Sequence, residues 1–288
     1  MQTIRLWIKQ TFPALYETLR TQLFPLAAKW RKKKAQNFTS ICIKPVSIHG
    51  HTFKIELNPK NGFVDRTIFT TGVYEPDILK TIKTHLPLGG VFIDVGANIG
   101  QHSLFAACCV GETGKVTAFE PLPFIAEQNE RSIKLNDFSD RITLHTIGCS
   151  DHEHTADIQV NSQNVGGSSL HTSDVSHAQI SISLTTADTY LSNEKRVDFI
   201  KIDTEGHELE TLTGLAQTIS QFSPTLLLEL SPSLYKDRNK VAEQIFDLLD
   251  THGYKYYDIE NGLQEISDNR NWLSGFNKLQ TNLLCTQE

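Results

Sequence analysis

The sequence lacks several patterns that mark common classes of protein. It has no run of 18 consecutive apolar residues and no uninterrupted apolar stretch at its N-terminus, so we expect a cytoplasmic protein without a membrane span. Its five cysteines form no CxxC pair and are odd in number, which argues against a disulfide framework or a structural zinc site. GxSxG and P-loop lysine motifs are also absent, so nothing supports a serine hydrolase or a P-loop NTPase.

Basic residues are scarce outside the N-terminal arm. Residues 1–40 hold eight Lys or Arg against one acid, a balance of +7, whereas the rest of the chain holds 19 basic and 32 acidic residues, a balance of −13. A protein that binds nucleic acid needs a positive surface on the domain that docks. We therefore expect no nucleic-acid partner.

The arm itself combines apolar side chains with a basic run, Arg31 to Lys34, in a pattern typical of one or two short amphipathic helices. Two interpretations stay open. The arm packs on its own domain or on a second copy of the chain, which we favour because its apolar face is short. Alternatively, it makes a peripheral contact with the inner face of a membrane.

From Val91 onward, short apolar runs alternate with segments of helical periodicity. Such runs are typical of strands buried on both faces of a parallel sheet, and the alternation predicts a doubly wound α/β fold. Two closing strands, with no helix between them, are expected at an antiparallel edge. The predicted strands are 91–95, 115–119, 141–147, 197–202, 225–230, 255–259 and 282–285, and the predicted helices are 102–109, 125–135, 205–219 and 240–251.

We divide the chain into an arm (1–40), a cap (41–85) and a main domain (86–288). The main domain carries an insertion rich in Ser, His, Asn and Gly, where α/β enzymes often keep their acceptor specificity. The cap is predicted to hold a hairpin, 41–48 with 51–57, and a helix, 75–86; the insertion, 152–185, is predicted to hold a hairpin of 156–160 and 179–184.

The most informative segment is the glycine turn of VFIDVGANIG, which contains Asp94, Gly96, Asn98 and Gly100. A strand that leads through such a turn into a helix forms a site for a nucleotide-like ligand. The dinucleotide fingerprint GxGxxG has a second glycine where this sequence has Asn98. The pattern thus favours a ligand without a diphosphate, such as S-adenosylmethionine, whose carboxylate suits a helix N-terminus.

Two acidic positions extend this site. Glu120 ends the next predicted strand, 20 residues beyond Gly100, where an acid accepts hydrogen bonds from ribose hydroxyls. Asp203 ends a later strand, and Glu205 and His207 follow it. These three are the candidate catalytic residues, because a carboxylate or an imidazole is needed to accept a proton from a hydroxyl nucleophile.

In these segments the chain resembles the FkbM-type family of S-adenosylmethionine-dependent methyltransferases. The resemblance covers residues 65–230 and rests on FIDVGANIG, TAFEP, IGCSD, GGSSL and FIKIDTEGHELETLTG, in this order. It implies a class I, Rossmann-like methyltransferase fold with a mostly parallel seven-stranded sheet and helices on both faces. It also implies methyl transfer mostly to hydroxyl oxygens of sugars, glycans or polyketide products.

Carried over by position, the resemblance implies a role for each motif. Asp94, Gly96, Asn98 and Gly100 would line the methionine end of S-adenosylmethionine, Glu120 would bind its ribose, and Asp151 would lie on its adenine side. Asp203 and Glu205 would lie nearest the transferred methyl group.

We therefore predict O-methylation of a hydroxyl on a glycan, glycolipid or secondary metabolite, with a small-molecule or glycan acceptor. The alternatives are N-methylation of an amine, or a non-catalytic module that binds partners through its arm. No metal is predicted, since the run Asp151-His152-Glu153-His154 is more typical of a solvated turn.

Overall fold

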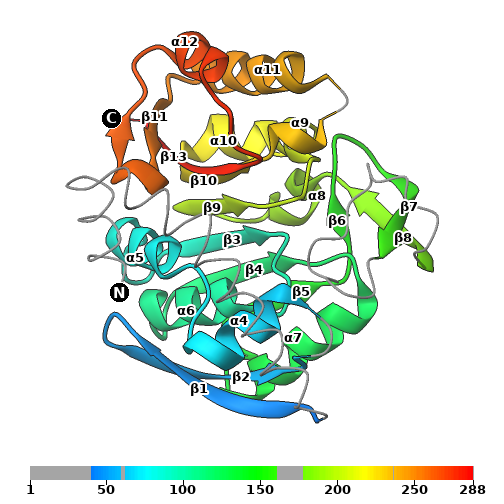
Figure 1. The fold of residues 1–288 in the computed structure, drawn as a ribbon. Coiled ribbons are helices and arrows are strands. Elements are labelled where there is room, and N and C mark those ends of the chain that lie inside the picture. The colour runs from blue at the N-terminus through cyan, green and yellow to red at the C-terminus, as the bar shows by residue number, and fades with distance from the viewer. Residues whose placement is uncertain (1–39, 60–61, 161–177, 236, 288) are drawn as a thin grey trace, which may run out of the picture.

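The computed structural model describes residues 40–59, 62–160, 178–235 and 237–287 (Figure 1). The N-terminal arm and the GGSSL element, residues 166–170, lie outside these ranges, so the predictions for them stay predictions. Within the described part of the chain, no helix is long and apolar enough to cross a membrane. All five cysteines are free thiols, as expected.

A mostly parallel sheet forms the centre of the molecule, as predicted. Its strand order is β12-β11-β13-β10-β9-β3-β4-β5, with β13 antiparallel to both β10 and β11. The strands are β3 (Val91–Val95), β4 (Lys115–Phe119), β5 (Ile142–His145), β9 (Phe199–Ile202), β10 (Thr225–Leu230), β11 (Lys255–Asp258), β12 (Gln264–Glu265) and β13 (Thr281–Thr286).

Side chains alternate between the two faces of this sheet and divide the core in two. Phe92 of β3 and Phe199 of β9 pack on one face, whereas Ile93 and Ile200 pack on the other. The helices are α6 (Gln101–Val110), α7 (Pro123–Leu135), α8 (Ala187–Leu191), α9 (Glu208–Thr213), α10 (Ala216–Phe222), α11 (Arg238–Thr251) and α12 (Asn269–Ser274), with two 3₁₀ turns, Pro232–Leu234 and Ile259–Asn261.

The cap lies against helices rather than directly on the sheet. Its antiparallel hairpin, β1 (Cys42–Ile48) and β2 (His51–Leu57), contacts α6 and α7, as the blue ribbon at the bottom of Figure 1 shows. The hairpin buries Phe53, Ile55 and Leu57 there. Two helices, α4 (Phe63–Thr71) and α5 (Pro76–His85), connect the hairpin to β3; the sequence analysis predicted only the second.

The insertion contains the predicted hairpin. β7 (His154–Val160) pairs with β8 (Ala178–Thr185) antiparallel, and the short strand β6 (Gly148–Cys149) joins them in a separate three-stranded sheet. This sheet lies at the right of Figure 1, beyond the end of the main sheet. It is followed by α8, a crossover helix of only five residues.

Three details of the prediction were wrong. Among the described residues the sheet has eight strands rather than seven, because the two-residue β12 extends its edge, and α12 lies between the closing strands. The segment 205–219 is not one helix. Glu205 and Gly206 have φ of 52° and 101°, which no α-helix accommodates, and Gly214 separates α9 from α10. A Cβ on Gly214 would lie 1.9 Å from the Ser150 carbonyl oxygen. The helix therefore breaks where its backbone passes close to the chain that follows β6.

Candidate active site

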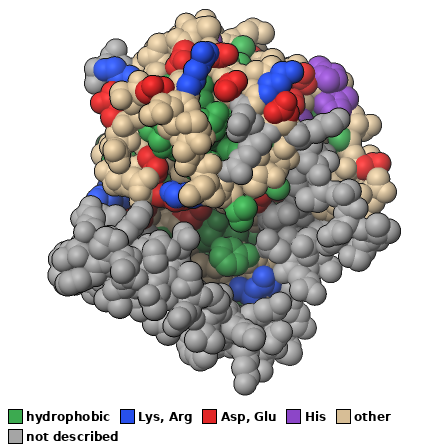
Figure 2. All heavy atoms as spheres, turned by 45° about the horizontal axis from the view of Figure 1, so that its top comes forward, with side chains coloured by type: hydrophobic (Ala, Val, Ile, Leu, Met, Phe, Trp, Pro, Cys, Tyr) green, Lys and Arg blue, Asp and Glu red, His purple; other side chains and the backbone are tan. Residues whose placement is uncertain are grey.

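A cavity lies at the carboxyl ends of β3, β4, β9 and β10, the edge of a parallel sheet where ligands bind in α/β folds. Figure 2 shows a hollow near the middle of one face, where acidic and apolar side chains come to the surface. Residues of the predicted site that line the cavity are Gly96, Asn98, Glu120, Asp203, Glu205 and His207; the cap adds Phe63, Val64 and Tyr74, and the C-terminal segment adds Gln280.

The glycine turn brings the backbones of two strands close together. Gly96 has φ of 78°, and a Cβ there would lie 1.8 Å from the Asp203 carbonyl oxygen. Gly100 has φ of 89°, and a Cβ there would lie 2.1 Å from Asn129 Oδ1. Gly96 and Asn98 line the cavity, whereas Gly100 does not. The role of Gly100 is therefore to let the turn enter α6 beside Asn129.

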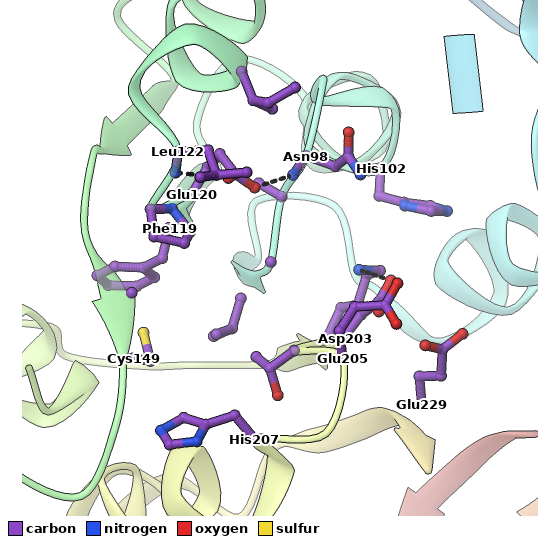
Figure 3. A pocket seen from close by; sticks show the side chains of 18 of the residues that line it. Asn98, His102, Phe119, Glu120, Leu122, Cys149, Asp203, Glu205, His207 and Glu229 are labelled. Carbon is purple, nitrogen blue, oxygen red and sulfur yellow. Dashed lines mark hydrogen bonds and ion pairs between the residues drawn. The ribbon is translucent and has the colours of Figure 1, made fainter. Parts of the chain in front are cut away.

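Glu120 lies just after β4, at the position that the sequence analysis predicted for it. Its Oε2 accepts a hydrogen bond from the Asn98 N–H and its Oε1 accepts one from the Leu122 N–H, both at 2.9 Å (Figure 3). Burial raises the pKa of Glu120 to about 7, although both N–H groups act in the opposite direction. Each carboxylate oxygen keeps a second lone pair for a ligand hydroxyl in the cavity.

Lys201 occupies the centre of the site, and the sequence analysis missed it. It is paired in register with Asp94 across β3 and β9, and its Nζ lies 3.6 Å from Asp94 Oδ1 and 3.1 Å from Asp203 Oδ2. Burial lowers the pKa of Lys201, but Asp203 and Asp94 outweigh burial and raise it. Asp94 is fully buried, accepts a hydrogen bond from Ser103 Oγ at 2.6 Å, and does not line the cavity. Asp94 thus contributes to the site indirectly, by holding the Lys201 ammonium in position.

Three carboxyl groups, those of Asp203, Glu205 and Glu229, lie close together beside Lys201. One carboxylate oxygen of each lies within 4.8 Å of those of the other two. Burial acts to raise the pKa of Asp203, but Lys201 and a hydrogen bond with Glu229 outweigh burial and lower it. Burial and the charge of Asp203 raise the pKa of Glu229 well above its usual value. Burial and Asp203 also raise the pKa of Glu205 to about 8. Asp203 therefore holds the negative charge, and its neighbours hold protons more readily.

Of His207, Glu208 and Asp151, only His207 lines the cavity. His207 Nε2 lies 3.0 Å from Ser150 Oγ at the cavity wall. Glu208, whose place in the first helical turn suits either a helix cap or a site residue, accepts hydrogen bonds from the Gly206 N–H at 2.9 Å and Tyr235 Oη at 2.7 Å, and does not line the cavity. Asp151 is exposed, and Gly148 and Cys149 line the cavity instead. This geometry does not support the assignment of Asp151 to the adenine side of the cofactor.

Two polar residues that the sequence analysis missed carried a signal. Lys201 lies within the apolar run FIKI and Glu229 within LLLEL, where strands buried on both faces have no room for an unpaired charge. A charged residue in such a strand indicates a partner or a ligand. The sequence gave no comparable indication for Tyr74. His102 gave none either, because it falls within the predicted helix 102–109.

These residues fit S-adenosylmethionine. The ligand carries a sulfonium and an ammonium, and the carboxyl groups of Glu120, Asp203 and Glu205 line the cavity. Burial raises the pKa of Glu120 to about 7 and, together with the charge of Asp203, raises that of Glu205 to about 8, so a cation bound beside them would stabilise the charged form that burial disfavours. The Gly96 turn leaves no space for a side chain, so the backbone itself forms the wall of the cavity.

Comparisons with known proteins match the chain to methyltransferases. The methyltransferase FkbM domain matches residues 94–256. The chain is 25% identical to the AMB antimetabolite synthetase AmbE of Pseudomonas aeruginosa in an alignment of 251 positions that covers 73% of this chain and 11% of AmbE. It is 26% identical to the hexuronic acid methyltransferase AglP of Haloferax volcanii over 149 residues, 50% of this chain and 58% of AglP.

The chain thus spans about a tenth of one curated relative and little more than half of the other. Among solved structures, a methyltransferase FkbM from Methylobacillus flagellatus KT superimposes with a TM-score of 0.44 and 17% identity, over 77% of this chain and 59% of that one. The domain match covers more than half of the 288 residues. The chain therefore belongs to the FkbM methyltransferase family, with a class I methyltransferase fold and S-adenosylmethionine as its cofactor.

Proposed function

We propose that the chain transfers a methyl group to a hydroxyl oxygen of a glycan, glycolipid or secondary metabolite. Its relatives support this range of acceptors: one is named as a hexuronic acid methyltransferase and the other as an antimetabolite synthetase. The observation that carries the proposal is Glu205, a cavity-lining carboxyl group beside the Asp203–Lys201 ion pair.

Glu205 has the properties that a hydroxyl acceptor requires of a base. A hydroxyl is a weak nucleophile at neutral pH, so a group must accept its proton, and an acid with a pKa near the working pH does this best. The pKa of Glu205 is about 8, raised by burial and by Asp203. Asp203 is a weaker base, because Lys201 lowers its pKa. An amine acceptor that is already unprotonated needs no such group.

The remaining predicted residues have supporting roles in this proposal. The backbone of Gly96 and Asn98 and the carboxylate of Glu120 bind the cofactor, while Asp94 holds Lys201 in place from beneath the cavity. When bound, S-adenosylmethionine supplies an electrophilic methyl group. The chain's own residues align the acceptor, which is worth about 7–11 kcal/mol for well-oriented reactants. Glu205 takes the proton, for a further factor of about 10² to 10⁴ in rate.

The test is the identity of the methylated product. Purified protein is incubated with methyl-labelled S-adenosylmethionine and fractionated cell extract, and labelled products are analysed by mass spectrometry and by alkaline treatment. A methyl ether, which survives mild alkali, is the expected result. An N-methyl product, or a methyl ester that alkali removes, would contradict the proposal.

A further inference from the structure

We propose that the part of the cavity lined by Tyr74, His102, Glu229 and Gln280 is the acceptor subsite, and that it takes an uncharged, hydroxyl-rich acceptor rather than a carboxylate-bearing sugar. This inference rests on the proposed function and narrows its range of substrates. The name "acceptor subsite" denotes these four residues.

Glu229 of the acceptor subsite lies away from Glu120, the residue that would bind the ribose of the cofactor. In the view of Figure 3, Glu120 and Glu229 lie on opposite sides of Asp203 and Glu205. Tyr74 comes from the cap and Gln280 from the C-terminal segment, and both lie outside residues 94–256, the part matched by the FkbM domain. Cofactor binding is what members of a methyltransferase family share, so wall residues from outside the shared domain are suited to recognise the acceptor.

The acceptor subsite is a built site with hydrogen-bonding groups directed by the fold. Gln101 fixes Tyr74, because its side-chain amide bonds the Tyr74 N–H and carbonyl oxygen, both at 2.8 Å. Gln280 Nε2 donates to Glu229 Oε1 at 2.7 Å. His102 is 6% exposed, and its Nε2 has no hydrogen-bond partner in the described chain, although Glu75 Oε2 lies 3.6 Å away. A buried polar atom without a partner is costly, and a ligand hydroxyl in the cavity would satisfy it.

The imidazole of His102 is neutral at physiological pH. Burial and the nearby charge of Lys201 lower its pKa to about 3, although Asp203 acts in the opposite direction. A neutral imidazole donates one hydrogen bond and accepts another, as a hydroxyl does, but it offers no charge to a carboxylate.

Whether the acceptor is neutral or anionic depends on the cationic side chains that could pair with a ligand carboxylate. Of the described residues that line the cavity, Lys201 alone is a Lys or Arg, and it is already paired with Asp94 and Asp203. The neighbouring carboxyl groups have raised pKa values, about 7 for Glu75 and about 8 for Glu205, with burial and Asp203 as the main causes. A ligand carboxylate would lie beside the charged Asp203 with no unpaired Lys or Arg among the described lining residues, whereas hydroxyl groups add no charge.

The test compares two probes that differ only at C6, methyl β-glucoside and methyl β-glucuronide. Saturation-transfer NMR at pH 7.5 measures their binding to full-length protein loaded with S-adenosylhomocysteine. We expect the glucoside to bind at least about tenfold more tightly than the glucuronide, because like charges across a binding site disfavour the wrong ligand. Equal or tighter binding of the glucuronide would overturn the inference, and so would binding of neither probe.

Three variants locate the effect. His102→Gln and Glu229→Gln should each weaken glucoside binding at least about fivefold while the affinity for S-adenosylhomocysteine, measured by calorimetry, stays within about twofold. Glu75→Gln removes one charge and should narrow the preference for the glucoside by at least about threefold. Glu243→Gln, on the exposed side of α11, is the matched control and should change nothing. Unchanged glucoside binding in both subsite variants would place the acceptor elsewhere.

The two proposals fail in different ways. If the labelled product from cell extract is a methyl ether of a uronic acid, O-methylation stands and the inference about charge is wrong. If the glucoside binds as expected but the product is an N-methyl compound, the proposed function is wrong, and the acceptor subsite still describes which molecules the cavity admits.

Discussion

The two ends of the cavity are built in different ways. Glu120 is held by the backbone N–H groups of Asn98 and Leu122, the farther of which is 22 residues away along the chain. Glu229 is held by side chains, with Gln280 donating from 51 residues later and Asp203 sharing a hydrogen bond across neighbouring strands. The cofactor end is thus a local product of one βαβ unit, and the other end exists only once the whole sheet has formed. Lys201 connects the two, because it contacts both Asp94 beneath the glycine turn and Asp203 beside Glu229.

The largest effect should come from removing this connection. Lys201→Met would leave the buried Asp94 and the partly buried Asp203 without a cation, and breaking a buried ion pair costs about 3–5 kcal/mol of stability. The loss would be measured as a lower free energy of unfolding in urea. Lys115→Met, at the exposed start of β4, is the matched control and should cost less than about 0.5 kcal/mol. Similar stabilities for the two variants would show that Lys201 does not hold the ends together.

Glu205 should separate chemistry from binding. Glu205→Gln keeps the shape of the side chain and removes its basicity, so turnover should fall at least about 10²-fold. The affinity for S-adenosylhomocysteine should remain within about twofold, because a neutral amide still fits the cavity wall. Turnover is measured at saturating S-adenosylmethionine with the methylated product as the readout. Wild-type turnover in this variant would exclude Glu205 as the base.

A change at Glu120 should instead lower the affinity for the cofactor. Glu120→Ala removes the carboxylate that we assign to the ribose, and two lost charge-assisted hydrogen bonds weaken binding by about 1–3 kcal/mol. Calorimetry with S-adenosylhomocysteine measures this loss. Glu120→Gln, which keeps one acceptor oxygen, should show a smaller one. If a folded Glu120→Ala protein binds the cofactor as the wild type does, the cofactor lies elsewhere.

The smallest effect is expected at Asp151. This residue is exposed and lies outside the cavity, so Asp151→Ala should change the affinity for S-adenosylhomocysteine by less than about twofold. The same calorimetric titration checks it. A loss comparable with that of Glu120→Ala would instead restore the adenine contact that the family resemblance implied.

The division between local and long-range construction also explains what the sequence revealed. The glycine turn and Glu120 depend on spacing within one βαβ unit, so the strands, the helices and the cofactor end were predictable from periodicity and motifs. His102 and Gln280 reach the site only through the packing of α6 and β13, and no local pattern distinguishes them. The break between α9 and α10 was missed for the same reason, since Gly214 is required by a contact with Ser150.

The central claim is that the carboxyl groups in and around the cavity select a cationic cofactor. The direct test is the ratio of affinities for S-adenosylmethionine and S-adenosylhomocysteine, measured by calorimetry from pH 5.5 to 8. These ligands differ by the methyl group and the sulfonium charge. Glu75, Glu120 and Glu205 have pKa values of about 7, 7 and 8, raised first by burial, so they lose protons and gain negative charge across this range. The preference for S-adenosylmethionine should therefore increase with pH, and a ratio that stays constant or falls would contradict the account.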